Sequence, residues 1–238
     1  ITLLCYYSNN KNTIKQIFKK LSKFDTPTIC NALELVDPKC QGQGYTKEPL
    51  MCLDSSLSPI IGFARTVKIY SGDKKTVITN IQRTKYYSYM DKGDLPKICV
   101  VQDTNNKPVG CFWGEVQTNI HKSMGFKGVV TNGAIRDVHM AAKNFQMLAK
   151  QILPSHAYEK FLSFGKKINV CGVDFKHDDI IHADQHGAVK IPIEYLKDLP
   201  KAVKQVLINE KPILDMCKKK KFTLEKLLKI VNKETEYH

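Results

Sequence analysis

Two short stretches in the middle of the chain combine residue types that bind anions and metal ions. In the first, Gly114 is followed by Glu115, Val116 and Gln117. At the start of a helix, the backbone N–H groups of such residues have no partner within the helix, and a glycine lets a ligand approach the backbone closely. The stretch therefore predicts a binding site for a carboxylate group.

The second stretch is Arg136-Asp137, which follows a turn at Asn132-Gly133. A guanidinium group can bind a carboxylate or an oxyanion, and an adjacent carboxylate can hold a hard divalent cation. Each stretch also has a structural interpretation, because Gly-Glu begins many helices and an Arg-Asp pair often forms only a helix cap and a surface ion pair. Taken separately, the two stretches leave both interpretations open.

The elements expected around these residues alternate between strand and helix. Residue patterns predict strands at residues 60–70, 98–102, 128–131, 168–173 and 180–191. They predict two helices within residues 11–35, the second capped by Asp25 or a following threonine, and further helices at residues 114–124, 138–150 and 193–232. A β-α-β-α order with helical ends predicts one layered α/β domain with a C-terminal helical arm.

Composition narrows the class of protein. The chain has 238 residues, 42% of them hydrophobic, which is enough for one large core. Its formal net charge of +14 would attract RNA, a membrane surface or an anionic metabolite. We do not expect nucleic-acid binding, because no module combines aromatic and basic residues, and the run Lys218 to Lys221 is typical of a solvated helix face. No apolar run approaches membrane-spanning length.

The cysteines and the first residues bear on the compartment. The eight cysteines are scattered without a Cys-x-x-Cys pair, which favours a reducing, cytoplasmic location. The opening Ile1 to Tyr7 is apolar but lacks the basic stretch and the cleavage site of a secretory signal.

Longer segments around both stretches resemble the RraA-like family, which includes the 4-hydroxy-4-methyl-2-oxoglutarate aldolases. The similar segments follow the family's order and cover residues 24–33, 61–67, 110–137 and 182–192. The resemblance implies a three-layer β/β/α swivelling-domain fold over residues 21–192, with an N-terminal helical segment (1–20) and a C-terminal helical arm (193–238). It also implies a homotrimer or a homohexamer with sites between subunits.

The resemblance further assigns roles to residues. The family's metal-holding carboxylate falls on Asp137, its substrate-binding arginine on Arg136, and its carboxylate-binding amides on Gly114 to Gln117. Glu115 matches the acidic position that family aldolases place near the metal and its water. Glu210 is the expected counterpart of an acidic residue from a neighbouring subunit's C-terminal helix, although a solvent-facing helix residue is an equal alternative.

These roles imply a lyase that depends on Mg²⁺ or Mn²⁺ and acts on a small 2-oxo acid. The cation would bind the acid's carboxylate and ketone oxygens and, with Arg136, would stabilise the pyruvate enolate that remains when a C–C bond breaks. Decarboxylation of oxaloacetate and retro-aldol cleavage of a 4-hydroxy-2-oxo acid both give this enolate.

The alternative from another class is a non-catalytic protein that binds and regulates a ribonuclease, as the family's namesake does. The intact Glu115 and Arg136-Asp137 favour the enzyme. The older family label of menaquinone methyltransferase is least favoured, because no glycine-rich nucleotide loop follows a first strand.

Some positions depart from the family's pattern. Asn31 and Asn132 stand where family members often have Asp, and residues 177–179 replace a Pro-Gly-Asp turn. We expect these changes to affect substrate specificity and turn geometry more than metal binding. A zinc cluster is a second interpretation of the nearby histidines and aspartates, but the resemblance treats this stretch as structural. These residues are His177, Asp178, Asp179, His182, Asp184 and His186.

Overall fold

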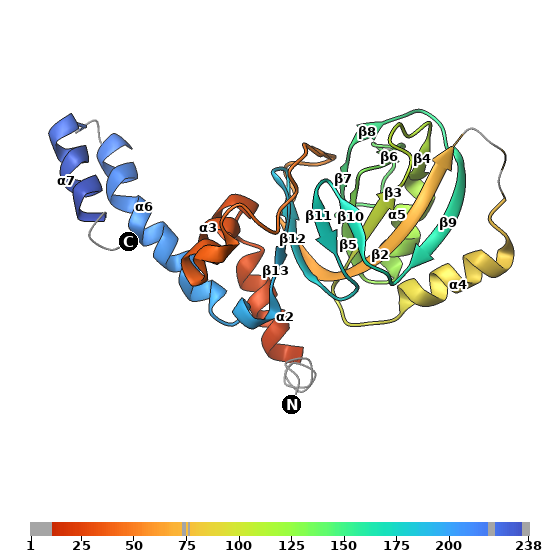
Figure 1. Ribbon diagram of the computed structural model, residues 1–238, viewed down its shortest axis with the longest axis horizontal. Helices are drawn as coiled ribbons and strands as arrows, with labels where there is room; N and C mark the ends of the chain where they lie inside the picture. The colour runs from red at the N-terminus through yellow and green to blue at the C-terminus, as the bar shows by residue number, and fades with distance from the viewer. Residues whose placement is uncertain (1–10, 73–74, 76, 219–221, 235–238) are drawn as a thin grey trace.

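The computed structural model describes residues 11–72, 75, 77–218 and 222–234. Residues 1–10, including the apolar Ile1 to Tyr7, and residues 219–221 of the lysine run lie outside this part. The described helices are α2 (Lys11–Leu21), α3 (Thr26–Val36), α4 (Asn80–Asp91), α5 (Glu115–Ser123), α6 (Leu199–Lys218) and α7 (Leu224–Glu234), with 3-10 turns η1 (Pro38–Cys40) and η2 (Ile193–Tyr195) (Figure 1).

The main sheet has the strand order β1-β7-β5-β3-β2-β12-β13, and β9 also pairs with β2. Its strands are β1 (Met51–Cys52), β2 (Ile60–Gly72), β3 (Lys97–Asp103), β5 (Phe126–Thr131), β7 (Gln146–Ala149), β9 (Tyr158–Phe164), β12 (Ile180–Asp184) and β13 (Gly187–Ile191). A second, parallel sheet joins β4 (Cys111–Trp113), β6 (Ala134–Ile135) and β8 (Gln151–Ile152), and β10 (Ile168–Val170) forms a hairpin with β11 (Val173–Phe175). The expected α/β class is confirmed.

The 13-residue strand β2 connects the two ends of the molecule. One long side of β2 pairs in parallel with β3. Along its other side, residues 60–63 pair with β12 and residues 67–72 pair with β9, both antiparallel. Nearly all of β2 is buried, including the polar side chains of Arg65, Thr66 and Ser71.

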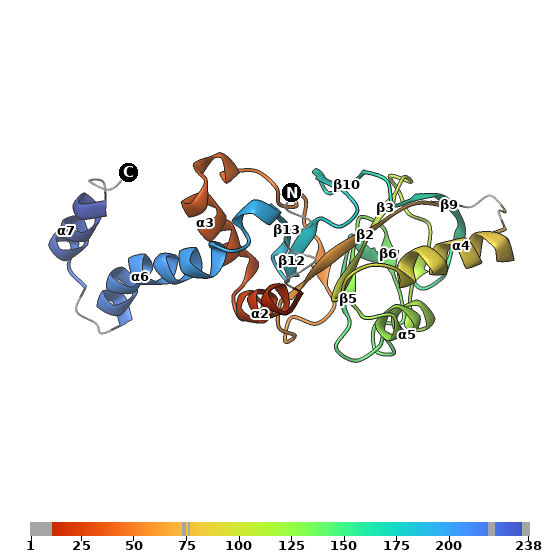
Figure 2. The same cartoon turned by 90° about the horizontal axis from the view of Figure 1, so that it is seen from below.

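Helices cover the sheet at separate places. One apolar cluster joins α2, α3 and α6 to β12 and β13, and a second joins α4 and residues of β4, β6 and β7 to one face of the central strands. The two faces of β3 illustrate the division, since Cys99 and Val101 belong to the second cluster whereas Ile98 and Val100 belong to a third cluster with the β10–β11 hairpin. Figure 2 shows α4 and α5 on the same side of the sheet.

The helix expected over residues 138–150 is wrong. Met140 and Ala141 donate backbone hydrogen bonds to Asp137 in a single turn, and the chain then forms strands β7 and β8. Asn144 has a positive φ of 56°, which interrupts any helix before the apolar residues begin. Every residue of β7 is buried, and a short apolar run of this kind does not distinguish an internal strand from a helix.

Other expectations at the ends of the chain are confirmed. The Asp25 side chain caps α3 by accepting a hydrogen bond from the Thr28 N–H at 3.0 Å. The C-terminal segment is helical, and α6 packs on α3 through Ala202, Val203 and Val206 before it extends away from the sheet with α7 (Figure 1). Among the described helices, none is long and apolar enough to cross a membrane.

Two buried histidines should make the stability of the fold depend on pH. His182 contacts Thr26 Oγ1 at 3.0 Å and His121 contacts the Tyr86 hydroxyl at 2.7 Å, and burial lowers the pKa of each histidine to about 4. In the unfolded chain they titrate near a pKa of about 6.5, so between these values the unfolded state binds more protons. Stability should therefore be lost as the pH falls from 6.5 to 4, by up to about 3 kcal/mol per histidine.

Urea unfolding at pH 7 and pH 5 measures this loss. His182→Gln should reduce the difference between the two free energies of unfolding, whereas the same change at the exposed His139 should leave it unchanged. An unaltered difference in His182→Gln would contradict the assignment.

Candidate active site

The amino end of α5 is held by a side chain from another part of the chain. Gly114 occupies the N-cap position, and the Asp137 carboxylate supplies the cap by accepting a hydrogen bond from the Glu115 N–H at 3.1 Å. The Glu115 amide is therefore not free, contrary to expectation. Within the described part of the chain, the amides of Val116 and Gln117 have no hydrogen-bond acceptor and can bind an anion.

Pairing of β4 with β6 brings the two stretches together. The Arg136 N–H donates to the Trp113 carbonyl at 2.9 Å, so Arg136 lies beside the residue that precedes Gly114. A Cβ atom at Gly114 would lie 2.5 Å from Asp137 Oδ2 and 3.1 Å from Arg136 Cγ. Glycine is required there by lack of space, since its φ of −165° is accessible to any residue.

Asp137 has a left-handed backbone conformation. Its φ is 56°, a conformation that Asp tolerates better than most residues. Its carboxylate contacts the Glu115 N–H through Oδ2, and Oδ1 lies 3.6 Å from a terminal nitrogen of Arg136. The side chains of Arg136 and Asp137 are 35% and 27% exposed, so both remain accessible to a ligand. Asp137 is thus a helix cap. The helix that it caps is α5, and no helix begins at Asp137 itself.

A cavity of about 160 Å³ adjoins these residues. This volume is smaller than the roughly 300–1,000 Å³ of sites for drug-sized molecules, and it suits a small acid. Its lining contains four of the expected residues, and Asp137 borders Gly114 at its edge. The lining residues are Ile78, Arg83, Cys111, Phe112, Gly114, Val116, Gln117, Arg136, His156 and Glu159.

Within one chain, Glu210 does not join this site. It is exposed on α6 and lines a separate groove of about 1,150 Å³ with Asn31 and Glu34 of α3. Figures 1 and 2 show α6 and α5 at opposite ends of the molecule. A role for Glu210 at the Arg136 cavity therefore requires a second copy of the chain.

Sequence reasoning missed three charged or titratable residues of the cavity. Arg83 lies on α4 and Glu159 on β9, two elements that the residue patterns did not reveal, and His156 lies just before β9. Burial raises the pKa of Glu159, and the nearby charges of His156 and Arg83 oppose this shift. One signal was present, because the lysine-rich chain has arginine at three positions, and two of them, Arg83 and Arg136, line this cavity.

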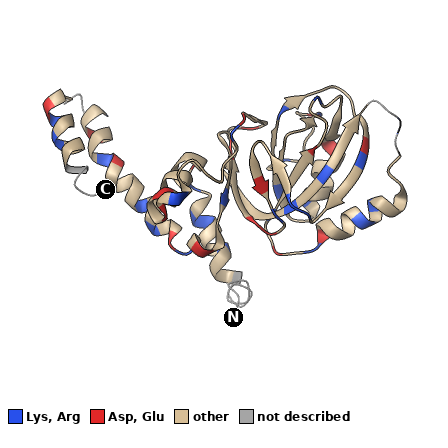
Figure 3. Ribbon diagram, in the orientation of Figure 1, with Lys and Arg blue, Asp and Glu red and all other residues tan. Residues whose placement is uncertain are grey.

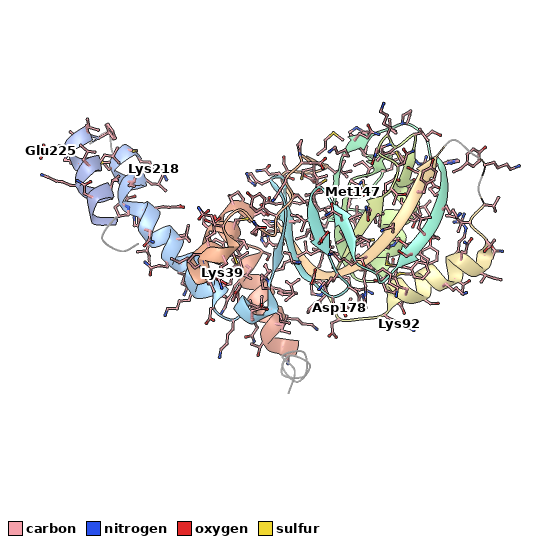
Figure 4. All side chains as sticks on the ribbon, in the orientation of Figure 1. Lys39, Lys92, Met147, Asp178, Lys218 and Glu225 are labelled. Atoms are coloured by element: carbon pink, nitrogen blue, oxygen red, sulfur yellow. The ribbon has the colours of Figure 1, made fainter. Side chains whose placement is uncertain are left out.

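The histidines of the C-terminal strands serve separate contacts. His177 contacts Arg65 at 2.8 Å, His182 contacts Thr26, and His186 contacts Asp184 at 3.1 Å. The buried Arg65 also binds the Lys92 carbonyl and Asp178, which lie near each other in Figure 4. No group of three or more His, Cys, Asp or Glu side chains placed to hold a metal ion occurs among the described residues.

The donors near Asp137 fit a hydrated hard cation better than a caged metal. Mg²⁺ usually keeps several waters and binds through one or two carboxylates plus the substrate. Asp137 Oδ1 is not engaged by the α5 amide, and the side chain is partly exposed at the cavity's edge. This arrangement is compatible with Mg²⁺ or Mn²⁺.

Comparison with known proteins defines the class. A profile of the RraA-like family, described as Aldolase/RraA, matches residues 26–190, and the chain belongs to this family. Protein DlpA of Legionella pneumophila subsp. pneumophila is 27% identical over 85% of the chain, which spans 32% of DlpA's length. A protein of Halalkalibacterium halodurans that carries the name 4-hydroxy-4-methyl-2-oxoglutarate aldolase is 28% identical to this chain. The match covers 56% of this chain and 60% of that protein.

A solved structure supports the same fold. Streptomyces coelicolor RraAS2, described as an unusual member of the RNase ES inhibitor RraA protein family, has a TM-score of 0.65 at 17% identity. The likeness covers 82% of this chain and 94% of RraAS2. The RraA-like family includes aldolases and also regulators without catalytic activity, so membership alone leaves the activity open.

The cap at α5 yields a prediction about stability. Asp137→Ala removes the acceptor for the Glu115 N–H and should lower the free energy of unfolding by about 1 kcal/mol. Asp137→Asn keeps an oxygen acceptor and should cost only a few tenths of a kcal/mol, because Asn and Asp cap equally well. Urea unfolding of the three proteins measures both values. Equal losses in the two variants would show that the hydrogen bond is not what stabilises α5.

Proposed function

We propose that this protein is a divalent-metal-dependent lyase that cleaves a C–C bond in 2-oxo acids to give pyruvate. The activity is of the 4-hydroxy-4-methyl-2-oxoglutarate aldolase type, the oxaloacetate decarboxylase type, or both. The observation that carries the proposal is the convergence of Arg136, Asp137 and the free α5 amides at one small cavity. The aldolase-named relative supports the same class.

Each part of the site has a role in binding the substrate. The amides of Val116 and Gln117, at the positive end of α5, bind the carboxylate next to the ketone. Arg136 donates to the ketone oxygen and strengthens this contact as negative charge develops there. Asp137 would hold a divalent cation, and Mg²⁺ or Mn²⁺ would supply additional positive charge that stabilises an enolate.

The same residues serve both cleavage reactions. In decarboxylation the C3–C4 bond breaks, CO₂ leaves, and the electron pair passes into the enolate. In retro-aldol cleavage the C4 hydroxyl also loses a proton as the bond breaks. Glu115, at the first turn of α5, exchanges protons with water, accepting one from the hydroxyl and returning one toward C3 to give pyruvate.

Asp137→Asn tests the assignment of the metal site. The Asp137→Asn variant should keep its fold, since the α5 cap is retained. Loss of the carboxylate charge should weaken Mg²⁺ binding and lower pyruvate release at least 100-fold. Calorimetric titration of Mg²⁺ measures binding, and pyruvate release from oxaloacetate and from 4-hydroxy-4-methyl-2-oxoglutarate measures turnover. A variant with the parent's metal dependence would rule out Asp137 as the metal-holding residue. A parent that releases no pyruvate from either acid would favour the ribonuclease-regulator alternative.

We also propose a homotrimer or homohexamer in which Glu210 of one copy completes the site of the next. Glu210 lies away from the cavity within a chain, and its helix exposes Leu207, Ile208 and Leu214 at 42%, 59% and 47%. These apolar side chains are available for contact with a second copy.

Subunit mixing tests this arrangement. Light scattering should give a multiple of three chains, and Glu210→Gln and Asp137→Asn proteins should each be inactive alone. Refolded together, they should regain activity, because some interfaces then pair an intact Glu210 with an intact Asp137. A monomer with full activity, or mixing without recovery, would exclude a shared site.

A further inference from the structure

The cavity contains a second arginine that the proposed reaction does not yet use. Of the three arginines, Arg65 is 2% exposed and bound to Lys92, His177 and Asp178. The other two, Arg83 and Arg136, line one cavity of about 160 Å³. In a chain rich in lysine, this placement is notable because a guanidinium binds a carboxylate through two parallel hydrogen bonds and an ammonium does not.

The start of α4 holds Arg83 in place. Thr79 and Gln82 form a capping box, and the Arg83 N–H donates to the Thr79 carbonyl at 3.0 Å. One turn later, the buried Tyr86 fixes the helix in the core. The backbone of α4 at Arg83 is therefore anchored, while the long Arg83 side chain remains exposed and able to adjust to a ligand.

Arg83 also faces the part of α5 that holds the free amides. Tyr87, four residues after Arg83, contacts the Gln117 side chain through its hydroxyl at 3.4 Å. Residues four apart share one face of a helix. The face of α4 that carries Arg83 therefore lies over the first turn of α5, where the 2-oxo acid's carboxylate is proposed to bind.

The cavity lining also includes apolar side chains. Ile78, Phe112 and Val116 supply apolar surface suited to a short carbon chain. Glu159 lies near enough to Arg83 for its pKa to be affected by the arginine's charge. A guanidinium has five N–H donors, so one neighbouring carboxylate leaves donors for a second anion.

We propose that Arg83 binds the distal carboxylate of the substrate, so that the site selects 2-oxo dicarboxylic acids over 2-oxo monocarboxylic acids. This inference rests on the proposed lyase function, in which the α5 amides and Arg136 bind the 2-oxo carboxylate end. Arg83 is a specificity residue in this arrangement, because it contacts the part of the substrate that leaves as CO₂ or as the released carbonyl compound.

The test compares substrates with and without the distal carboxylate. Arg83→Gln should lower kcat/KM for oxaloacetate and for 4-hydroxy-4-methyl-2-oxoglutarate by about 10- to 100-fold, mainly through KM, as expected for a lost charged hydrogen bond. Exchange of the C3 protons of pyruvate in D₂O with Mg²⁺, followed by NMR, needs no distal carboxylate and should stay within about twofold of the parent. Arg83→Lys should recover part of the loss, since it restores the charge without the planar fork.

Lys85→Gln is the matched control, because it removes one positive charge from the same helix at an exposed position that does not line the cavity. It should leave both reactions unchanged. An unaltered KM for the dicarboxylic acids in Arg83→Gln would overturn the inference, as would an equal loss of pyruvate exchange, which would indicate a role in shaping the site. If the parent protein neither cleaves these acids nor exchanges pyruvate protons, the lyase function itself fails, and the role of Arg83 fails with it.

Discussion

The hydrogen bond from the Glu115 N–H to Asp137 Oδ2 is the interaction on which the site depends. It joins the start of α5 to the chain after β6, two segments that the β4–β6 pairing has already placed side by side. The contact is possible because Gly114 has no side chain and because Asp137 adopts a left-handed backbone. The same carboxylate thus stabilises the start of α5 through Oδ2 and leaves Oδ1 beside the Arg136 side chain.

The strand β2 sets the larger geometry. Because β12 and β9 share one side of β2, the molecule has two ends, one built on β12, β13 and the terminal helices, the other on β9, α4 and α5. The candidate active site lies at the second end, and the arm lies at the first (Figure 1). This separation explains why Glu210 requires another copy of the chain if it is to act at the site.

The net charge of +14 has no single structural location. Figure 3 shows Lys and Arg positions on the terminal helices, on the sheet and on α4. The cavity differs from the rest of the surface in the type of positive group, because two of the three arginines line it beside the start of α5. Directional donors of this type recognise carboxylates, whereas dispersed lysines act mainly through long-range attraction.

The sequence by itself determined the fold family and the Gly114 and Arg136-Asp137 stretches, because these depend on local residue types in a recognisable order. It also identified the helix cap at Asp25, which is a local interaction. Tertiary structure alone decided that residues 146–149 form an internal strand, since burial on both faces removes the periodicity that distinguishes strand from helix. It alone brought Arg83, His156 and Glu159 to the cavity, because contacts between α4, β9 and α5 join residues far apart in the chain and leave no local pattern.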